Sequence, residues 1–315
     1  MSEHENKHAK DDHDHEHEGH DHSHAPKNFG MAFTIGTTLN LGFVILEVVS
    51  GLYAHSLALV ADAGHNMGDV LGLLLAWGAS ILSRSAPTQR RTYGLRSSSI
   101  LAALFNAIFL LVSVGAIAWE AIRRFGDPTD VAGKTVIWVS AVGIAINTIT
   151  ALMFMSGRKG DLNIRGAFMH MAADAGISAG VVVAGFVILA TGYHWIDPVV
   201  SLIISAAIVW GTWGLLRDSV NLALHAVPEG IDLEKVKAYL AALPHVTAVH
   251  DLHVWPMSTT ETALTAHLVR DVDRCDSSLL EKCCKDLHDK FEIQHATIQF
   301  ETEDHDCDLA PEEIV

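Results

Sequence analysis

Charge is scarce in the middle of this 315-residue sequence. Residues 29–228 hold ten acidic and eleven basic side chains, so this segment carries a net charge of only +1 and consists mostly of apolar runs. Such a composition excludes an all-soluble protein and predicts a helical membrane domain. The net charge of −16 comes from the two ends, because residues 1–28 carry −5 and residues 229–315 carry −12.

Other absences narrow the function further. Basic clusters that neutralise phosphates are missing, which excludes binding to nucleic acid. The first 28 residues contain no apolar run, so we expect no cleavable signal peptide. The cysteines all lie in the C-terminal part without the spacing of a disulfide framework, which suits a reducing, cytoplasmic location. They are Cys275, Cys283, Cys284 and Cys307.

The central segment divides into six apolar stretches separated by charged or proline-containing breaks. Each stretch is long enough to cross about 30 Å of hydrocarbon as a helix. An even number of spans places both termini on the same side of the membrane. The predicted spans are residues 29–53, 57–83, 97–123, 134–156, 166–191 and 197–217.

The basic residues in the loops predict the orientation. Loops on the side of the termini contain Arg84, Arg90, Arg91, Arg96, Arg158, Lys159 and Arg165. The opposite loops contain only Arg123, Arg124 and Lys134. By the positive-inside rule, both termini are expected in the cytoplasm.

After Pro228 the composition becomes that of a small soluble domain. The patterns predict helix, strand, strand, helix and strand in that order, at residues 232–243, 247–255, 261–270, 277–291 and 293–301. The fold class is therefore an all-α six-helix transmembrane domain followed by an α/β ferredoxin-like (αββαβ) cytoplasmic domain without a first strand. We divide the chain into a His-rich tail (1–28), a transport domain (29–228), a metal-binding and dimerisation domain (229–303) and a C-terminal tail (304–315).

Two spans repeat the same pair of ionisable residues at helical spacing. The second span has His65 and Asp69, and the fifth has His170 and Asp174. Residues four apart lie on one face of a helix, and an unpaired Asp in a bilayer costs roughly 2.5–3.5 kcal/mol. If the two faces meet, two imidazoles and two carboxylates form a tetrahedral site for a dication such as Zn²⁺. The alternative is that each pair is a local hydrogen bond at a polar helix interface.

Further polar residues occur at membrane depth. For Asn40, Asn106 and Asn147 we favour interhelical hydrogen bonds. Glu47 is expected either beside a water-filled path or in its protonated form. Asp62 is expected to support the ligands or to lie at the aqueous mouth, and not to be a ligand itself.

Histidines also gather in both polar ends. Those of residues 4–24 alternate with Asp and Glu, and this tail is expected to collect metal weakly while remaining disordered. In the C-terminal domain, His253 and His267 fall on facing strands, and His295 and Glu301 on the last strand. We expect these four residues to form a regulatory metal site, with His305 and Cys307 as additional donors.

Several stretches of the chain resemble the cation diffusion facilitator family of zinc exporters, in particular its bacterial members. They include Ser56–His65, the second HxxxD motif, the segment from Asp218 to Leu224, and the strands from His250 to Trp255 and from Ala296 to Glu301. The resemblance implies a transport site of His65, Asp69, His170 and Asp174 with a preference for zinc. It also implies a homodimer joined through the cytoplasmic domain, proton antiport, and an inner-membrane location.

The sequence departs from some family members in two loops. Residues 87–94 contain no His or Asp, so the additional metal site that some members have there is expected to be missing. For residues 156–161 we expect a short turn instead of a His-rich loop, which favours the bacterial type.

The expected activity is zinc efflux in exchange for protons, because a histidine must be neutral and an aspartate ionised to bind the metal. A broader divalent-cation exporter (cobalt, cadmium, nickel), a membrane metal sensor without transport, and a channel are the alternatives. An intramembrane metallohydrolase is disfavoured, because it needs an open position on the metal and four ligands leave none. We therefore expect no enzyme activity.

Overall fold

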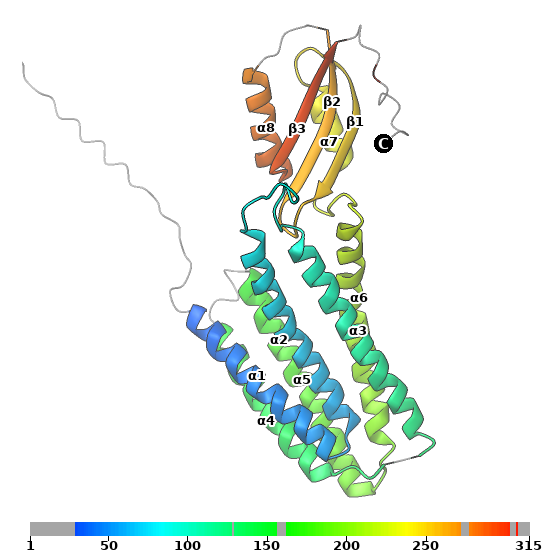
Figure 1. Ribbon diagram of the computed structural model, residues 1–315. Helices are drawn as coiled ribbons and strands as arrows, with labels where there is room; N and C mark the ends of the chain where they lie inside the picture. Colours follow the sequence, from blue (N-terminus) through cyan, green and yellow to red (C-terminus); the bar gives the residue numbers. More distant parts are fainter. Residues whose placement is uncertain (1–28, 128, 156–161, 272–276, 303–306, 308–315) are drawn as a thin grey trace, which may run out of the picture.

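The computed structural model describes residues 29–127, 129–155, 162–271, 277–302 and 307. Six long helices form a bundle, and a small α/β domain lies at one end of it (Figure 1). We call that end of the bundle the domain end and the opposite end the distal end. The His-rich tail and most of the C-terminal tail lie outside the described residues.

The six helices agree with the predicted spans. They are α1 (Phe29–Tyr53), α2 (Leu57–Ser83), α3 (Ser98–Arg124), α4 (Gly133–Phe154), α5 (Leu162–Thr191) and α6 (Ile196–Ala223). Among the described residues, five helices are long and apolar enough to cross a membrane, and α1 contributes a shorter apolar stretch, Thr38–Tyr53. This confirms the predicted helical membrane domain.

Helix packing divides the bundle into pairs. The most extensive contacts join α4 to α5 and α3 to α6, while α2 packs on α1 and α3. Glycine makes the α4–α5 contact close: a Cβ atom on Gly133 would lie 3.1 Å from the carbonyl oxygen of Gly185. Helices α2 and α5, which carry the two HxxxD motifs, touch each other only over a short stretch.

The distal half of the bundle is a continuous apolar core. Apolar side chains from all six helices are buried there against one another, with Phe43 as the contribution of α1. They include Ala54, Ala58, Leu59, Ala61, Val114, Val136, Val139, Val181, Ile188, Ile204 and Ile208.

A buried carboxylate ties the helices together at the distal end. Asp197 of α6 is 1% exposed and accepts hydrogen bonds from Ser56 Oγ and from the backbone N–H groups of Leu57 and Ala58. Its Oδ2 also lies 3.9 Å from Nη1 of Arg124, at the end of α3. The anion therefore occupies the positive end of the α2 dipole and links α2, α3 and α6.

The small domain has the predicted order: α7 (Leu233–Ala241), β1 (Val246–Pro256), β2 (Thr262–Arg270), α8 (Ser277–Phe291) and β3 (His295–Thr302). β1 pairs with β2 antiparallel, and β2 pairs with β3 parallel. In a complete split βαβ unit another strand would separate the two parallel strands. Its absence here brings β3 directly beside β2, which confirms the ferredoxin-like prediction without the first strand.

Both helices of the small domain cover one face of the sheet. Val236 and Leu240 of α7 and Leu279 and Leu287 of α8 share one core. On β2 the core residues are Leu264, Ala266 and Leu268, so Thr265, His267 and Val269 point to the other face. Polar donors on β2 are therefore presented on the face that the two helices leave uncovered.

Candidate metal centres

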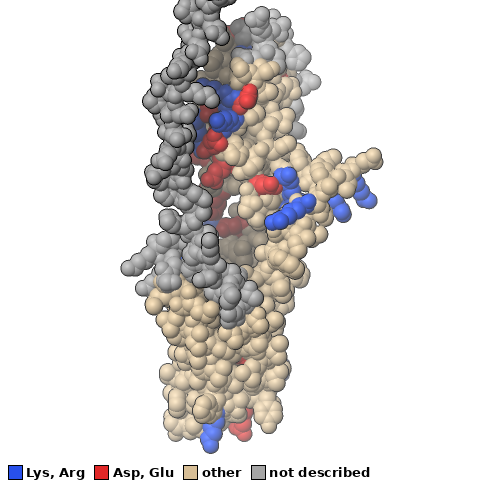
Figure 2. Space-filling model, turned by 90° about the vertical axis from the view of Figure 1, so that its left-hand side faces the viewer, with Lys and Arg blue, Asp and Glu red and all other residues tan. Residues whose placement is uncertain are grey.

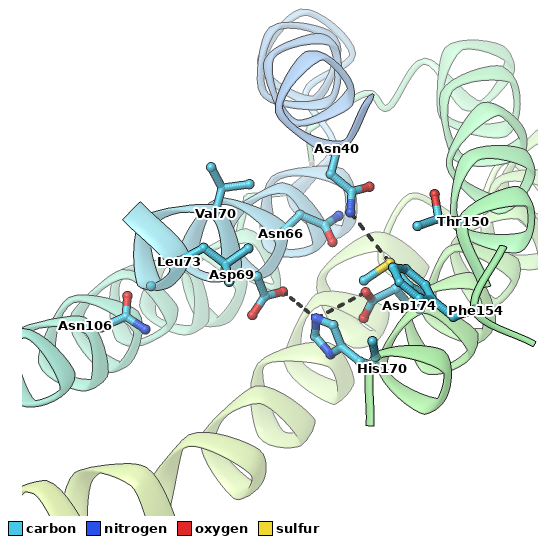
Figure 3. A pocket seen from close by; sticks show the side chains of 13 residues that line it. Asn40, Asn66, Asp69, Val70, Leu73, Asn106, Thr150, Phe154, His170 and Asp174 are labelled. Carbon is cyan, nitrogen blue, oxygen red and sulfur yellow. Dashed lines mark hydrogen bonds and ion pairs between the residues drawn. The ribbon is translucent and has the colours of Figure 1, made fainter. Parts of the chain in front are cut away.

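The two HxxxD motifs meet at the centre of the bundle. Nε2 of His170 lies 3.2 Å from Asp69 Oδ2 and 3.6 Å from Asp174 Oδ2 (Figure 3). Nε2 of His65 lies 3.3 Å from Asp174 Oδ1 and 3.8 Å from Asp69 Oδ2. Each carboxylate thus faces both imidazoles, and the four side chains form a closed ring that we call the quartet.

The quartet is shielded from solvent to different degrees. Asp174 is 1% exposed, whereas the side chains of Asp69 and His170 are 32% and 40% exposed. No ion pair joins the quartet to Lys or Arg in the part of the chain that the structure describes. Two imidazoles and two carboxylates with no basic partner have the donor types and count of a tetrahedral Zn²⁺ site.

A cavity of about 350 Å³ reaches the quartet from the domain end. Its lining includes Asp69, His170 and Asp174 together with amide, hydroxyl and apolar side chains from five helices. Most of the added residues, Asn106, Thr150 and Phe154 among them, lie in the half of their helix nearer the domain end, whereas Asn66 lies on the distal side of Asp69. Figure 3 shows the lining residues from close by. The added residues are Asn40, Asn66, Val70, Gly72, Leu73, Asn106, Thr150, Phe154, Ala167 and Met171. No residue of the buried distal cluster lines this cavity.

Behind the quartet lie two buried carboxyl groups that do not line this cavity. Glu47 and Asp62 are both 0% exposed. Asn66 Nδ2 donates to Glu47 Oε2 at 3.1 Å, and Ser178 Oγ donates to Asp62 Oδ2 at 3.0 Å. Asp62 is therefore not at an aqueous mouth, and that interpretation of the sequence is wrong.

The prediction of interhelical hydrogen bonds for the membrane asparagines is confirmed for Asn40, whose Nδ2 on α1 donates to Met171 Sδ on α5 at 3.6 Å. Asn40 and Asn106 line the cavity. The Oδ1 atoms of Asn106 and Asn147 are buried without a hydrogen-bond partner among the described residues. Apolar spacing alone could not distinguish a cavity wall from a helix interface, because both place an amide on an inward face.

A second cluster of donors lies on the sheet face that the helices leave uncovered. His250 Nε2 is 3.0 Å from Glu301 Oε2, and His267 Nδ1 is 2.9 Å from Glu301 Oε1. Cys307 Sγ lies 3.7 Å from His267 Nδ1. One ligand atom from each of these four residues fits within 4.8 Å of the others, and the mixture of imidazole, carboxylate and thiol suits Zn²⁺.

The structure brings together only part of the regulatory set predicted from the sequence. His267 and Glu301 are in the cluster, and His253 reaches it through Asp251, whose Oδ1 is 2.8 Å from His253 Nε2 and whose Oδ2 is 3.3 Å from His267 Nε2. His295 lies at the opposite end of β3, where its ring contacts Tyr93 at 5.7 Å. Residue types alone could not reveal that β3 separates His295 from Glu301 by nearly its whole length.

His250 enters the cluster because β1 is irregular. Strict alternation places His253 with Asp251 and excludes His250, but the pairing with β2 shifts between His250 and His253. Asp251 has φ +48°, as expected of a bulge residue that turns its neighbours out of alternation. The HDLH sequence offered no glycine that would have signalled this bulge.

Glu301 is held in its ionised form in this cluster. Burial by itself would raise the pKa of Glu301, but hydrogen bonds from His250, Cys307 and Gln299 and the charge of His267 together lower that pKa below its ordinary value. A carboxylate in this state is ready to bind a cation.

Comparison with known proteins bears on both centres. Residues 33–222 match the family described as cation efflux transmembrane domain. The chain belongs to the cation efflux family. Residues 228–303 match the cytoplasmic domain of cation efflux proteins. Members of this family are transporters and not enzymes, and the several apolar helices agree with a multi-pass membrane protein.

Individual relatives cover most of this cation efflux protein. The zinc transporter ZitB of Escherichia coli is 36% identical over 86% of each chain. The cadmium, cobalt and zinc/H(+)-K(+) antiporter of Bacillus subtilis is 33% identical over 85% of this chain and 88% of its own. A solved structure, the metal-bound C-terminal domain of the CzcD transporter from Cupriavidus metallidurans, is 39% identical over 22% of this chain and 99% of its own, with a TM-score of 0.21.

Proposed function

We propose that this protein exports zinc from the cytoplasm in exchange for protons, and that the quartet of His65, Asp69, His170 and Asp174 is its transport site. The observation that carries the proposal is the closed ring of two imidazoles and two carboxylates at the inner end of a cavity that opens in one direction. Its donors suit Zn²⁺, and the names of the relatives agree with metal efflux.

Proton exchange follows from the chemistry of the ligands. A histidine binds metal only when neutral, and an aspartate binds best when ionised. A proton arriving from a more acidic outside therefore competes with zinc for the same atoms and promotes release there. The antiporter among the relatives supports such coupling.

We propose that both termini and the small domain lie in the cytoplasm. Figure 2 shows a face of the bundle that is mostly uncharged, with Lys and Arg side chains near its junction with the small domain. The match of residues 228–303 to a cytoplasmic domain supports the same orientation. In this orientation the cavity opens to the cytoplasm, so the described conformation is inward-facing. The membrane that holds the protein is then the inner membrane of a bacterial cell.

The two parts of the chain have different proposed roles. We propose residues 29–228 as the transport domain and 229–303 as a domain that dimerises and senses metal through His250, His267, Glu301 and Cys307. A core of this size gains from association with a second copy. Metal held on the uncovered sheet face would stabilise one arrangement of the dimer and so raise transport when cytoplasmic zinc is high.

Flux in proteoliposomes tests the proposal. Purified protein is reconstituted with a zinc-sensitive dye inside, and zinc uptake is followed with and without an acidic lumen. We expect uptake driven by the pH gradient in the wild type and in Asp130→Asn, a fully exposed carboxylate in a distal loop that serves as the matched control. Uptake in Asp174→Asn should fall to the level of empty liposomes.

Two other outcomes would change the conclusion. Wild-type protein that binds zinc without moving it would support a membrane metal sensor. Equal competition by cadmium or cobalt would support a broader divalent-cation exporter, as the name of the Bacillus relative indicates for that protein.

A further inference from the structure

Two carboxyl groups behind the quartet take no part in the proposed metal site. They belong to Glu47 of α1 and Asp62 of α2, and we call them the carboxyl pair. Both side chains are 0% exposed, and neither forms an ion pair with Lys or Arg among the described residues. A negative charge in such a place is costly, because neither water nor a cation compensates it.

The ionisable groups that face the carboxyl pair are those of the quartet. The charge of Asp174 on α5 acts on both members of the pair, and the charge of His65 acts on Asp62. α4, which packs on α1 and α5, has Lys134 as its only charged residue, in its first turn at the distal end. α3 and α6, which pack on α2, carry their charged residues near their ends. The described part of the bundle therefore offers the pair no basic partner.

The hydrogen bonds of the carboxyl pair are incomplete in a specific way. Asn66 Nδ2 donates to Glu47 Oε2, and Ser178 Oγ donates to Asp62 Oδ2. The other oxygen of each group, Glu47 Oε1 and Asp62 Oδ1, is buried and receives no hydrogen bond from the described residues. The two carboxyl groups lie within hydrogen-bond reach of each other. One proton on Glu47, donated to Asp62, would therefore satisfy both oxygens.

Asp197 shows how the same bundle compensates a buried carboxylate by other means. It is 1% exposed, accepts three hydrogen bonds and lies 3.9 Å from Nη1 of Arg124. The carboxyl pair has two donors for its four oxygens and no arginine. Two carboxylates at close range also repel each other, which favours a shared proton over two negative charges.

The carboxyl pair lies close to both the quartet and the cavity. Asp62 precedes His65 by three residues, so it lies on the same face of α2, one turn nearer the distal end. Asn66, which donates to Glu47, lines the cavity that reaches the quartet. Water in this cavity is therefore one side chain away from the pair.

We propose that the carboxyl pair is a proton-binding site, separate from the metal ligands, that holds one of the protons exchanged for zinc. This inference rests on the proposed exchange of zinc for protons at the quartet. Zinc arriving at the quartet brings two positive charges, which favour ionisation of both carboxyl groups. The O–H bond of Glu47 then breaks, and its proton passes to water in the cavity. A proton taken up later from outside restores this bond and, by linkage, weakens the binding of zinc.

A count of protons tests the proposal. Purified full-length protein is saturated with zinc in weakly buffered solution, and a pH indicator measures the protons released. Glu47→Gln should release about one proton fewer per chain than the wild type, because its amide stays neutral while it still reaches Asn66 and Asp62. Asp130→Asn, which changes a fully exposed carboxylate, is the matched control and should release the wild-type number. Protons from other zinc sites cancel in these differences.

A double variant tests whether the two groups share a single proton. Asp62→Asn should also release about one proton fewer, because Glu47 without an ionised neighbour stays protonated. The combination of Glu47→Gln with Asp62→Asn should again lose one proton and not two. Zinc stoichiometry, measured by equilibrium dialysis, and elution as a single species identify a variant that fails to fold. If one single variant fails this check, the other still provides the test.

Flux shows whether this proton is exchanged for zinc. In proteoliposomes, an acidic lumen should stimulate zinc uptake several-fold less in Glu47→Gln than in the wild type. Uptake driven by a zinc gradient alone should stay within about twofold of the wild type, because the quartet is intact. Asp130→Asn should match the wild type in both conditions.

The outcomes distinguish the carboxyl pair from the proposed function. Unchanged proton release in Glu47→Gln and Asp62→Asn overturns the pair as a proton site and leaves the quartet standing. A double variant that loses two protons overturns the sharing. Wild-type stimulation by acid in Glu47→Gln overturns the role of the pair in exchange, whereas wild-type protein without uptake driven by the pH gradient overturns the proposed exchange itself.

Discussion

The distal half of the bundle packs apolar side chains from six helices against one another, whereas the half next to the small domain surrounds two cavities whose walls combine apolar side chains with amides, hydroxyls and charged groups. The quartet lies where the two halves meet. A protein that binds an ion at such a boundary exposes it to one side at a time. The contrast between a packed distal half and a hollowed domain half agrees with the proposed export of metal.

The largest effect should come from the carboxylate that holds the distal end. Asp197→Asn removes the negative charge that faces the start of α2. It also turns an amide N–H group toward the backbone N–H groups of Leu57 and Ala58, so the packing of the distal half should loosen. In a Val181→Cys background, labelling from outside by a thiol reagent that does not cross membranes should become about tenfold faster, a population shift of about 1.4 kcal/mol.

The control for this change is Asp130→Asn, which removes an exposed carboxylate from the same end. The native cysteines lie in the last 41 residues, on the cytoplasmic side of the proposed orientation, and should not react. If Val181→Cys stays as protected in Asp197→Asn as without it, Asp197 does not hold the distal half closed.

Truncating valines in the two halves should give unequal losses of stability. Val181→Ala leaves a hole in the dry distal core, for which we expect a cost of about 1–2 kcal/mol. Val70→Ala enlarges an existing cavity beside polar groups, and its cost should be smaller. Reversible unfolding in detergent measures both free energies, and equal losses would contradict the contrast between the halves.

Acid should weaken the small domain before it affects the distal core. The lowered pKa of Glu301 stabilises the folded state above the ordinary carboxyl pKa, and this contribution disappears as the pH falls through the lowered value. Hydrogen exchange of β3 in the metal-free full-length protein should therefore rise at acidic pH. Glu301→Gln should remove that dependence, and a pH profile identical to that of the wild type would exclude Glu301 as its source.

The smallest effect on stability is expected at the ion pair between the domains. Arg96 and Glu261 are 40% and 35% exposed, so Arg96→Ala should cost less than about 1 kcal/mol in the free energy of unfolding. Raising the salt concentration should weaken the wild-type contact and leave Arg96→Ala unchanged, as thermal unfolding at several ionic strengths would show.

Much of this architecture could be predicted because membrane helices and paired motifs leave strong local patterns. The spacing of His65 with Asp69 and of His170 with Asp174 indicated which faces should meet, and the structure places those faces together. The order αββαβ followed from alternation and turn residues in a short soluble segment.

The remaining features depend on relations between distant elements. The bulge at Asp251 that brings in His250 depends on strand pairing, and the place of Asp197 beneath α2 depends on how α6 packs. The close contact of Gly72 with Asn106 exists only because α2 and α3 approach closely there. No local pattern in the sequence encodes the distance between two helices.

The quartet joins α2 and α5, two helices that otherwise touch each other only briefly. A bound ion would therefore act as a removable cross-link between the α2 side and the α4–α5 pair. At a metal concentration a hundredfold above the dissociation constant, such an ion stabilises the assembly by about 2.7 kcal/mol. The melting temperature of the purified protein should consequently rise as the quartet fills, without any measurement of flux.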